Sequence, residues 1–226
     1  MTRLAAKPDI KITTYITNAG SEIVRMYGLR QRLEKISTGS YYSEIISDAD
    51  DGYGSPSTGR LMRGKYALLV VAPSSANTTA KIVHGISDTV VTNAVAQAMK
   101  SRTPVLILPS EECKELVETT LPYRIESSAC RSCHPCPAAQ SCPCGAIGPT
   151  DRGEMRIDLR RCNACGICLG TCSHSAARFK ETAPVFPRQM DTDMIRQLKS
   201  ISGLSVVQNP VELEQRIGYT LKGDSS

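Results

Sequence analysis

Four cysteines stand within eleven positions of the sequence, spaced Cys162-x2-Cys165-x2-Cys168-x3-Cys172. Thiolates at this spacing are typical ligands of [4Fe–4S] clusters, because three thiolates on a tight loop can reach three corners of one cuboidal core while the fourth departs toward a neighbouring cluster. Ser173 stands where such a run usually has proline, and this difference removes no ligand. The run therefore predicts an electron-transfer site.

A second cysteine run lies upstream. It is spaced Cys130-x2-Cys133-x2-Cys136 and is followed by Cys142 in CPCGAIG, with five residues in the last gap where the other run has three. Together the runs resemble a two-cluster ferredoxin, and CPCGAIG resembles the end of one ferredoxin half-motif. The resemblance implies two [4Fe–4S] clusters with these ligands: Cys130, Cys133, Cys136 and Cys172 for one, and Cys142, Cys162, Cys165 and Cys168 for the other.

Other interpretations of these residues stay open. Four thiolates also bind zinc, although a zinc site does not need the doubled run. Cys144 competes with Cys142 as a ligand, and we favour Cys142 because Pro143 follows it. We expect Cys113 to be a plain thiol outside the clusters, and His134 to be solvated or to lie beside a ligand.

Several stretches predict an α/β domain that would position this chemistry. Residues 9–17 alternate apolar and polar side chains, whereas residues 66–73 and 103–110 are continuous apolar runs, typical of strands buried on both faces. A helical pattern separates the last two stretches, so a parallel sheet with crossover helices is expected. Residues 191–217 repeat the helix–strand–helix rhythm, and residues 37–60 predict a loop or mobile flap.

The cysteine runs interrupt this domain. We expect an α/β domain over 1–125, a ferredoxin-like α+β insert over 126–183, and a helix–strand–helix segment over 184–226 that completes the first domain. The first stretch, MTRLAAKP, predicts either a helical cap or frayed tail, or a start inside a longer parental domain.

Small and hydroxyl residues follow the strand at 66–73, in the stretch APSSANTTAKIVHGISD, where a helix opens. Such a helix start can bind an anion at the carboxyl end of a strand. The alternative is an ordinary capped helix, in which Ser75 or Thr78 satisfies backbone N–H groups. PSSANT (73–78) resembles the PASANT motif of the flavin-dependent family that includes cysteine decarboxylases and archaeoflavoproteins, and the match continues through AKI-x-x-GISD-x-x-VTNA.

This resemblance implies a flavodoxin-like fold, a parallel sheet with helices on both faces, and assemblies built from trimers with FMN at subunit boundaries. It places FMN against the following residues: Thr17, Ser75, Ala76, Asn77 and Thr78. Asp88 is a weaker candidate. Members of the family normally begin with one more strand and a glycine-rich phosphate loop, and neither precedes residue 9 here.

An archaeoflavoprotein interrupted by a two-cluster ferredoxin resembles the archaeal dihydromethanopterin reductases. The resemblance implies an oxidoreductase in which a low-potential donor, expected to be a protein, reduces the clusters. The clusters would reduce FMN. The reduced FMN would deliver a hydride to a pterin C=N bond, converting dihydromethanopterin to tetrahydromethanopterin. Tyr41, Tyr42 and Tyr53 are expected to close over a flat ring. No catalytic residue or proton donor is assigned.

Two alternatives remain at this point. One is a ferredoxin–flavin relay between protein partners without a small-molecule substrate. The other is a flavin-dependent decarboxylase or prenyltransferase relative that has gained clusters. The decarboxylase branch has a catalytic histidine before the PASANT strand, whereas the histidines here are His84, His134 and His174.

Composition excludes some classes of protein. Hydrophobic residues make up 41% and charged residues 22% of the 226-residue chain, as in ordinary globular proteins. The formal net charge is +5, but no basic stripe is interleaved with aromatic residues, so no nucleic-acid partner is expected. No apolar run is long enough to span a membrane, and no secretory signal stands at the start, so we expect a cytoplasmic protein.

Overall fold

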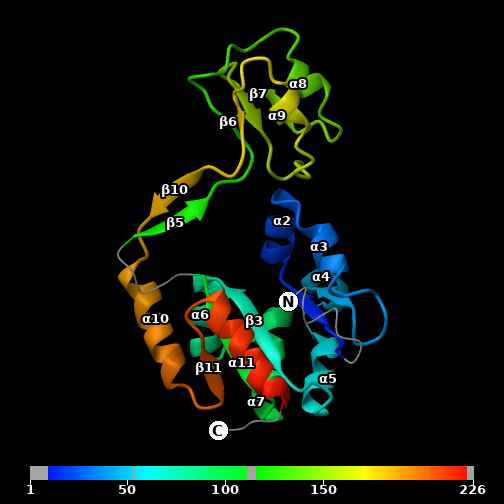
Figure 1. Cartoon of the computed structure of the whole chain (residues 1–226), viewed down its shortest axis with the longest axis vertical. Helices are drawn as coiled ribbons and strands as arrows, with labels where there is room; N and C mark the ends of the chain where they lie inside the picture. The colour runs from blue at the N-terminus through cyan, green and yellow to red at the C-terminus, as the bar shows by residue number, and fades with distance from the viewer. Residues whose placement is uncertain (1–9, 53, 111–115, 223–226) are drawn as a thin grey trace. The chain divides into compact units, whose positions relative to one another are not determined.

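The computed structural model describes residues 10–52, 54–110 and 116–222, which form two compact units (Figure 1). The α/β unit comprises the described parts of Met1–Asn18, Lys35–Val117 and Phe186–Ser226. The cysteine-rich unit comprises Ala19–Glu34 and Glu118–Val185. The stretch 1–8, Tyr53 and Cys113, about which the sequence made predictions, lie outside the described residues.

A three-stranded parallel sheet forms the centre of the α/β unit. Its order is β11 (Leu204–Val206), β4 (Val105–Pro109), β3 (Leu69–Ser74). The continuous apolar runs form β3 and β4. The central strand β4 is buried on both faces, as expected for a sheet covered on both sides, whereas β3 leaves Ala72 and Pro73 exposed. On β4, Val105 and Ile107 belong to one core cluster and Leu106 to another.

Helices cover each face of this sheet. Helices α6 (Ala76–Val83), α7 (Val90–Lys100) and α10 (Gln189–Ser200) pack on the face that carries Val105 and Ile107, with Ala98 and Leu198 fully buried between them. Helix α11 (Pro210–Lys222) packs Leu213 and Ile217 on the other face against Leu106. The β–α–β prediction of a parallel sheet with helices on both faces is confirmed.

A second parallel pair joins β1 (Thr14–Ile16) to β2 (Ile45–Ser47). The prediction that 37–60 form only a loop or flap is therefore wrong. Besides β2, this stretch contains α4 (Asp48–Asp51), the 3₁₀-helix η1 (Pro56–Thr58) and the start of α5 (Gly59–Met62). The Ile45–Ile46 pair is too short to give an alternating pattern, yet Ile46 is buried, and Ser47 and Asp50 form a capping box that starts α4.

The cysteine-rich unit consists of two similar halves. The first runs from β6 (Arg124–Ile125) through α8 (Pro137–Gln140) to β7 (Ile147–Pro149), and the second from β8 (Met155–Ile157) through α9 (Ile167–Thr171) to β9 (Ala177–Arg178). The first strand of each half pairs antiparallel with the last strand of the other, β6 with β9 and β8 with β7. Strands β5 (Val117–Thr120) and β10 (Thr182–Val185) pair where the chain enters and leaves this unit.

The segment Ala19–Glu34 groups with the cysteine-rich unit, although its sequence position lies among α/β elements. It carries most of α2 (Asn18–Met26) and all of α3 (Arg30–Glu34). Gly28 turns the chain between the helices at φ +65°, and a Cβ there would lie 3.4 Å from the Ala164 Cβ. The Tyr27 hydroxyl donates to the Thr120 carbonyl at 2.5 Å. These contacts attach the segment to the loop between Cys162 and Cys165 and to strand β5.

Candidate functional site

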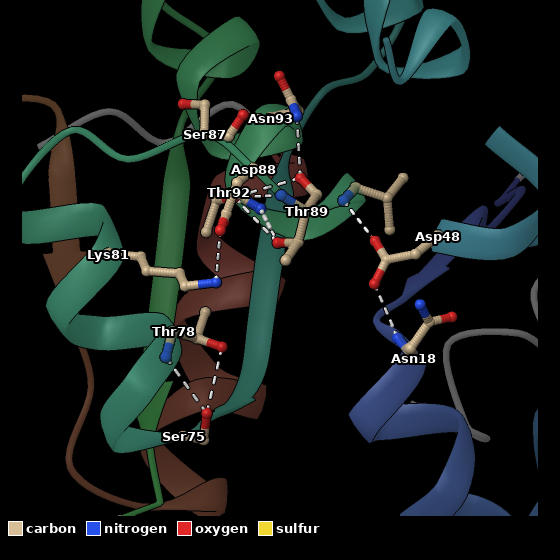
Figure 2. A network of polar contacts seen from close by, with 11 residues as sticks. Asn18, Asp48, Ser75, Thr78, Lys81, Ser87, Asp88, Thr89, Thr92 and Asn93 are labelled. Carbon is tan, nitrogen blue, oxygen red and sulfur yellow. Dashed lines mark hydrogen bonds and ion pairs between the residues drawn. The ribbon is translucent and has the colours of Figure 1, made fainter. Parts of the chain in front are cut away.

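The carboxyl end of β3 leads directly into the start of α6. Ser74 is fully buried and its hydroxyl lies 3.0 Å from that of Thr79, which fixes the first turn of the helix to the strand end. Ser75 is the N-cap: its Oγ accepts from the Thr78 N–H at 3.3 Å and donates to Thr78 Oγ1 at 3.2 Å (Figure 2). The capped-helix interpretation is therefore observed.

Capping does not use every group at this helix start. The N–H groups of Ala76 and Asn77 belong to the first turn, where an α-helix supplies no acceptor of its own. Ser75 and Asn77 are exposed, and Ala76 and Thr78 are partly buried. Four of the five residues predicted to contact a flavin thus lie at one exposed helix start, at the strand edge where ligands of α/β proteins bind.

Asp48, which the sequence did not single out, joins two other helix starts, that of α2 after β1 and that of α7 after the segment that follows α6. It follows β2, and its Oδ2 accepts from the Asn18 N–H of α2 at 2.8 Å, while its Oδ1 accepts from the Val90 N–H of α7 at 2.7 Å (Figure 2). Thr17, the fifth predicted flavin contact, immediately precedes Asn18. The Ser47–Asp50 capping box was the sequence signal for a helix start here.

Asp88, the weaker candidate, accepts from Lys81 Nζ at 2.8 Å (Figure 2). The ion pair connects α6 to the segment before α7, and whether Asp88 also contacts a flavin stays a prediction. Tyr41 and Tyr42 pack edge to face with centroids 4.5 Å apart, and the Arg60 guanidinium lies 4.3 Å from the Tyr41 ring centre. Whether these rings cover a ligand stays a prediction.

Five cysteines line one hollow within the cysteine-rich unit. They are Cys142, Cys144, Cys162, Cys165 and Cys168. Tyr123 also lines the hollow, stacked on Phe179 with ring centres 3.9 Å apart. The four cysteines that the sequence assigned to one cluster are therefore brought together, with the competing Cys144 beside Cys142 at an Sγ–Sγ distance of 3.8 Å.

The thiols of this hollow influence one another. Burial raises the pKa of the Cys168 thiol to about 11, and the neighbouring Cys162 and Cys165 add to the shift. Burial also raises the pKa of Cys162. At Cys142 burial opposes ionisation, but backbone N–H groups, Ala146 first, hold its pKa below the usual value. A bound cation would relieve this mutual repulsion of thiolates.

The two halves repeat their backbone geometry around corresponding cysteines. Cys142 and Cys172 each accept an N–H from the alanine four residues later, Ala146 and Ala176, at 3.3 Å. Ser132 and Ala164, at matching places in the two runs, both have positive φ. At the junction of α8 and α9, the Ser141 and Thr171 hydroxyls lie 2.9 Å apart. Cys142 is thus the structural counterpart of Cys172, whereas Cys144 has no counterpart in the second run.

The remaining predicted ligands are Cys130, Cys133 and Cys136 of the first run and Cys172 of the second. Three of them, all but Cys133, pack against the same core as the hollow. Among the described residues, no three His, Cys, Asp or Glu side chains converge as the ligands of a single metal ion would. His134 is exposed, with Nδ1 3.0 Å from the Cys133 carbonyl oxygen.

A model of the family described as Flavoprotein matches residues 2–119. The chain belongs to the flavoprotein family. It is 37% identical to a dihydromethanopterin reductase (acceptor) of Methanosarcina mazei over 90% of this chain and 84% of the relative. It is 40% identical to a dihydromethanopterin reductase (acceptor) of Methanocaldococcus jannaschii over 91% of this chain and 82% of the relative.

Among solved structures, the chain resembles Burkholderia xenovorans DmrB in complex with FMN, described as a cubic protein cage for redox transfer. The TM-score is 0.51 at 18% identity, over 96% of this chain and 98% of that one, which supports the mixed α/β fold. The prediction of an enzyme related to dihydromethanopterin reductase (acceptor) is confirmed, and this flavoprotein is a flavin-dependent oxidoreductase. Within residues 10–52, 54–110 and 116–222, no helix is long and apolar enough to cross a membrane.

Proposed function

We propose that this flavoprotein reduces a pterin C=N bond, converting dihydromethanopterin to tetrahydromethanopterin, with electrons that pass through two [4Fe–4S] clusters to FMN. Two relatives that share more than a third of its residues over nine tenths of its length are named for this reductase. The electron donor is a low-potential protein, and the enzyme is a homo-oligomer built from trimers.

The hollow lined by five cysteines is the observation that carries the electron path. A zinc ion needs ligands that meet at one atom, whereas a [4Fe–4S] core takes one thiolate at each of four separate irons. Cysteines that surround a hollow without converging on a point fit the cuboidal core. The N–H groups of Ala146 and Ala164, which donate to the Cys142 and Cys162 Sγ atoms at 3.3 and 3.4 Å, would stabilise the thiolate charge.

The start of α6 fits the phosphate of FMN. Its first-turn N–H groups and the Thr78 hydroxyl, whose oxygen accepts from Ser75 Oγ, present donors at the carboxyl end of β3, and the helix dipole favours an anion there. Thr17 offers a further hydroxyl at the end of β1. When bound, the clusters supply single electrons and FMN supplies the two-electron reduction of the pterin.

The residues of the chain have separate tasks in this scheme. Ser75 and Thr78 hold the anionic end of the cofactor, and Ser74 and Thr79 keep their helix fixed to the strand. Cys142, Cys162, Cys165 and Cys168 hold one cluster, and Cys130, Cys133, Cys136 and Cys172 hold the other. Tyr123, packed over the hollow with Phe179, restricts access of water to the first of these clusters.

An anaerobic reconstitution tests the proposal. Iron, sulfide and flavin are measured in the whole chain, which is then reduced and mixed with dihydromethanopterin while flavin absorbance is followed. We expect about eight irons per chain, because each of two clusters contributes four, and reoxidation of the flavin only when the pterin is present.

Two results would contradict the proposal. In the first, the clusters are complete, but the reduced flavin is not reoxidised by pterins and instead reduces a protein acceptor. This result would show that the protein is an electron relay. In the second, the protein contains zinc in place of iron and sulfide, which would rule out the proposed electron path because zinc is not redox-active.

A further inference from the structure

Arg25, in the last turn of α2, reaches the backbone of the second cysteine run. Its Nη1 donates to the carbonyl oxygen of Leu159 at 2.8 Å and to that of Cys162 at 2.5 Å. Cys162 lines the hollow and is a proposed cluster ligand. A positive charge is therefore fixed one peptide group away from a thiolate that would bind iron.

The surroundings of Arg25 hold it in this place. Gly28, three residues later, packs against Ala164 inside the Cys162–Cys165 loop. The Tyr27 ring lies 6.2 Å from that of Phe179, which stacks on Tyr123 at the hollow. Arg25 is partly buried, so its charge is screened less than that of a surface arginine.

We propose that Arg25 raises the reduction potential of the cluster held by Cys142, Cys162, Cys165 and Cys168, and so makes this cluster easier to reduce than it would be with a neutral residue at position 25. The inference rests on the proposed function. Reduction adds one electron from the external donor, breaks no bond and makes the cluster more negative by one charge. A fixed cation nearby stabilises that reduced form, and the reduction potential of such clusters depends on local charge and hydrogen bonds.

Arg25 is a positioning residue, because it acts through the Cys162 backbone. The test compares whole, reconstituted chains carrying R25Q, R25K or the control R30Q. Arg30 lies in the same segment but is exposed and pairs with Glu34 at 2.8 Å. Redox titration with low-temperature electron paramagnetic resonance reports the potential of each cluster, without flavin or pterin turnover.

We expect R25Q to lower the potential of one cluster and to leave the other unchanged, with full iron content. R25K should restore most of the potential because its ammonium keeps the charge, and R30Q should match wild type. Two unchanged potentials in R25Q would overturn the proposal. Loss of iron in R25Q would also overturn it, in favour of a purely structural clamp.

The titration separates this inference from the proposed function. Unchanged potentials in R25Q, in a chain that still reduces the pterin, would refute only the role of Arg25. A wild-type chain that takes up no iron would overturn both.

Discussion

At the scale of single residues, the repeat favours Cys142 over the nearby Cys144 as the cluster ligand that we propose. Cys142 shares with Cys172 an N–H bond from the alanine four residues later and a positive φ three residues later, at Gly145 and Ser175. We expect C142S to lose one cluster, about four of eight irons, and C144S to keep both. Iron analysis and paramagnetic resonance of the reconstituted variants measure this. Loss of iron in C144S alone would reverse the assignment.

Ser75 has two proposed tasks, and two substitutions separate them. S75A removes the N-cap, so the free energy of unfolding should fall by about 1 kcal/mol. S75D keeps a good cap but adds a negative charge where the flavin phosphate is proposed to bind. We expect S75D to unfold like wild type yet to retain far less flavin, measured by absorbance after gel filtration. Wild-type flavin content in S75D would contradict the proposal that the flavin phosphate binds at the start of α6.

At the scale of elements, Asp48 connects the starts of two helices, α2 directly after β1 and α7 after the segment that follows α6. Its two oxygens accept the first N–H groups of α2 and α7, at 2.8 and 2.7 Å. D48A leaves both donors without this acceptor and removes a negative charge from two helix starts, so unfolding free energy should fall by about 2 kcal/mol. Urea denaturation at fixed protein concentration measures the change. E34A, on the exposed end of α3, is the control; equal stability of D48A and E34A would contradict the prediction.

The same elements show which parts of the fold and site the sequence could predict. The runs around Val71 and Ile107 are long and apolar enough to identify their strands and the parallel sheet, and the cysteine spacing identified four residues that line one hollow. Strand β2 was missed because its burial depends on pairing with β1, which no local pattern records. The attachment of Ala19–Glu34 to the cysteine-rich unit was missed for the same reason, since Arg25 binds carbonyl groups more than 130 positions away in the chain.

At the scale of the whole molecule, each proposed cofactor is held by residues of one compact unit. The flavin candidates Thr17, Ser75 and Asn77 belong to the α/β unit, and all eight proposed cluster ligands belong to the cysteine-rich unit. The chain crosses between the units at residues 18–19, 34–35, 117–118 and 185–186, so the cysteine-rich unit is formed from two separate segments. Binding of one cofactor should therefore not require the ligands of the other.

This division predicts the behaviour of a chain that has lost one cluster. C165S removes a ligand from the hollow, where Cys165 is the exposed member, and should leave the flavin content of the α/β unit unchanged. A small chemical reductant should still reduce its flavin directly, and the reduced flavin should still be reoxidised by dihydromethanopterin. Reduction by a protein donor should become at least tenfold slower, because the proposed electron path is interrupted; stopped-flow absorbance measures both rates. Retention of the wild-type protein-donor rate in C165S would mean that this cluster lies off the path, and loss of flavin together with iron would mean that the two units do not bind their cofactors separately.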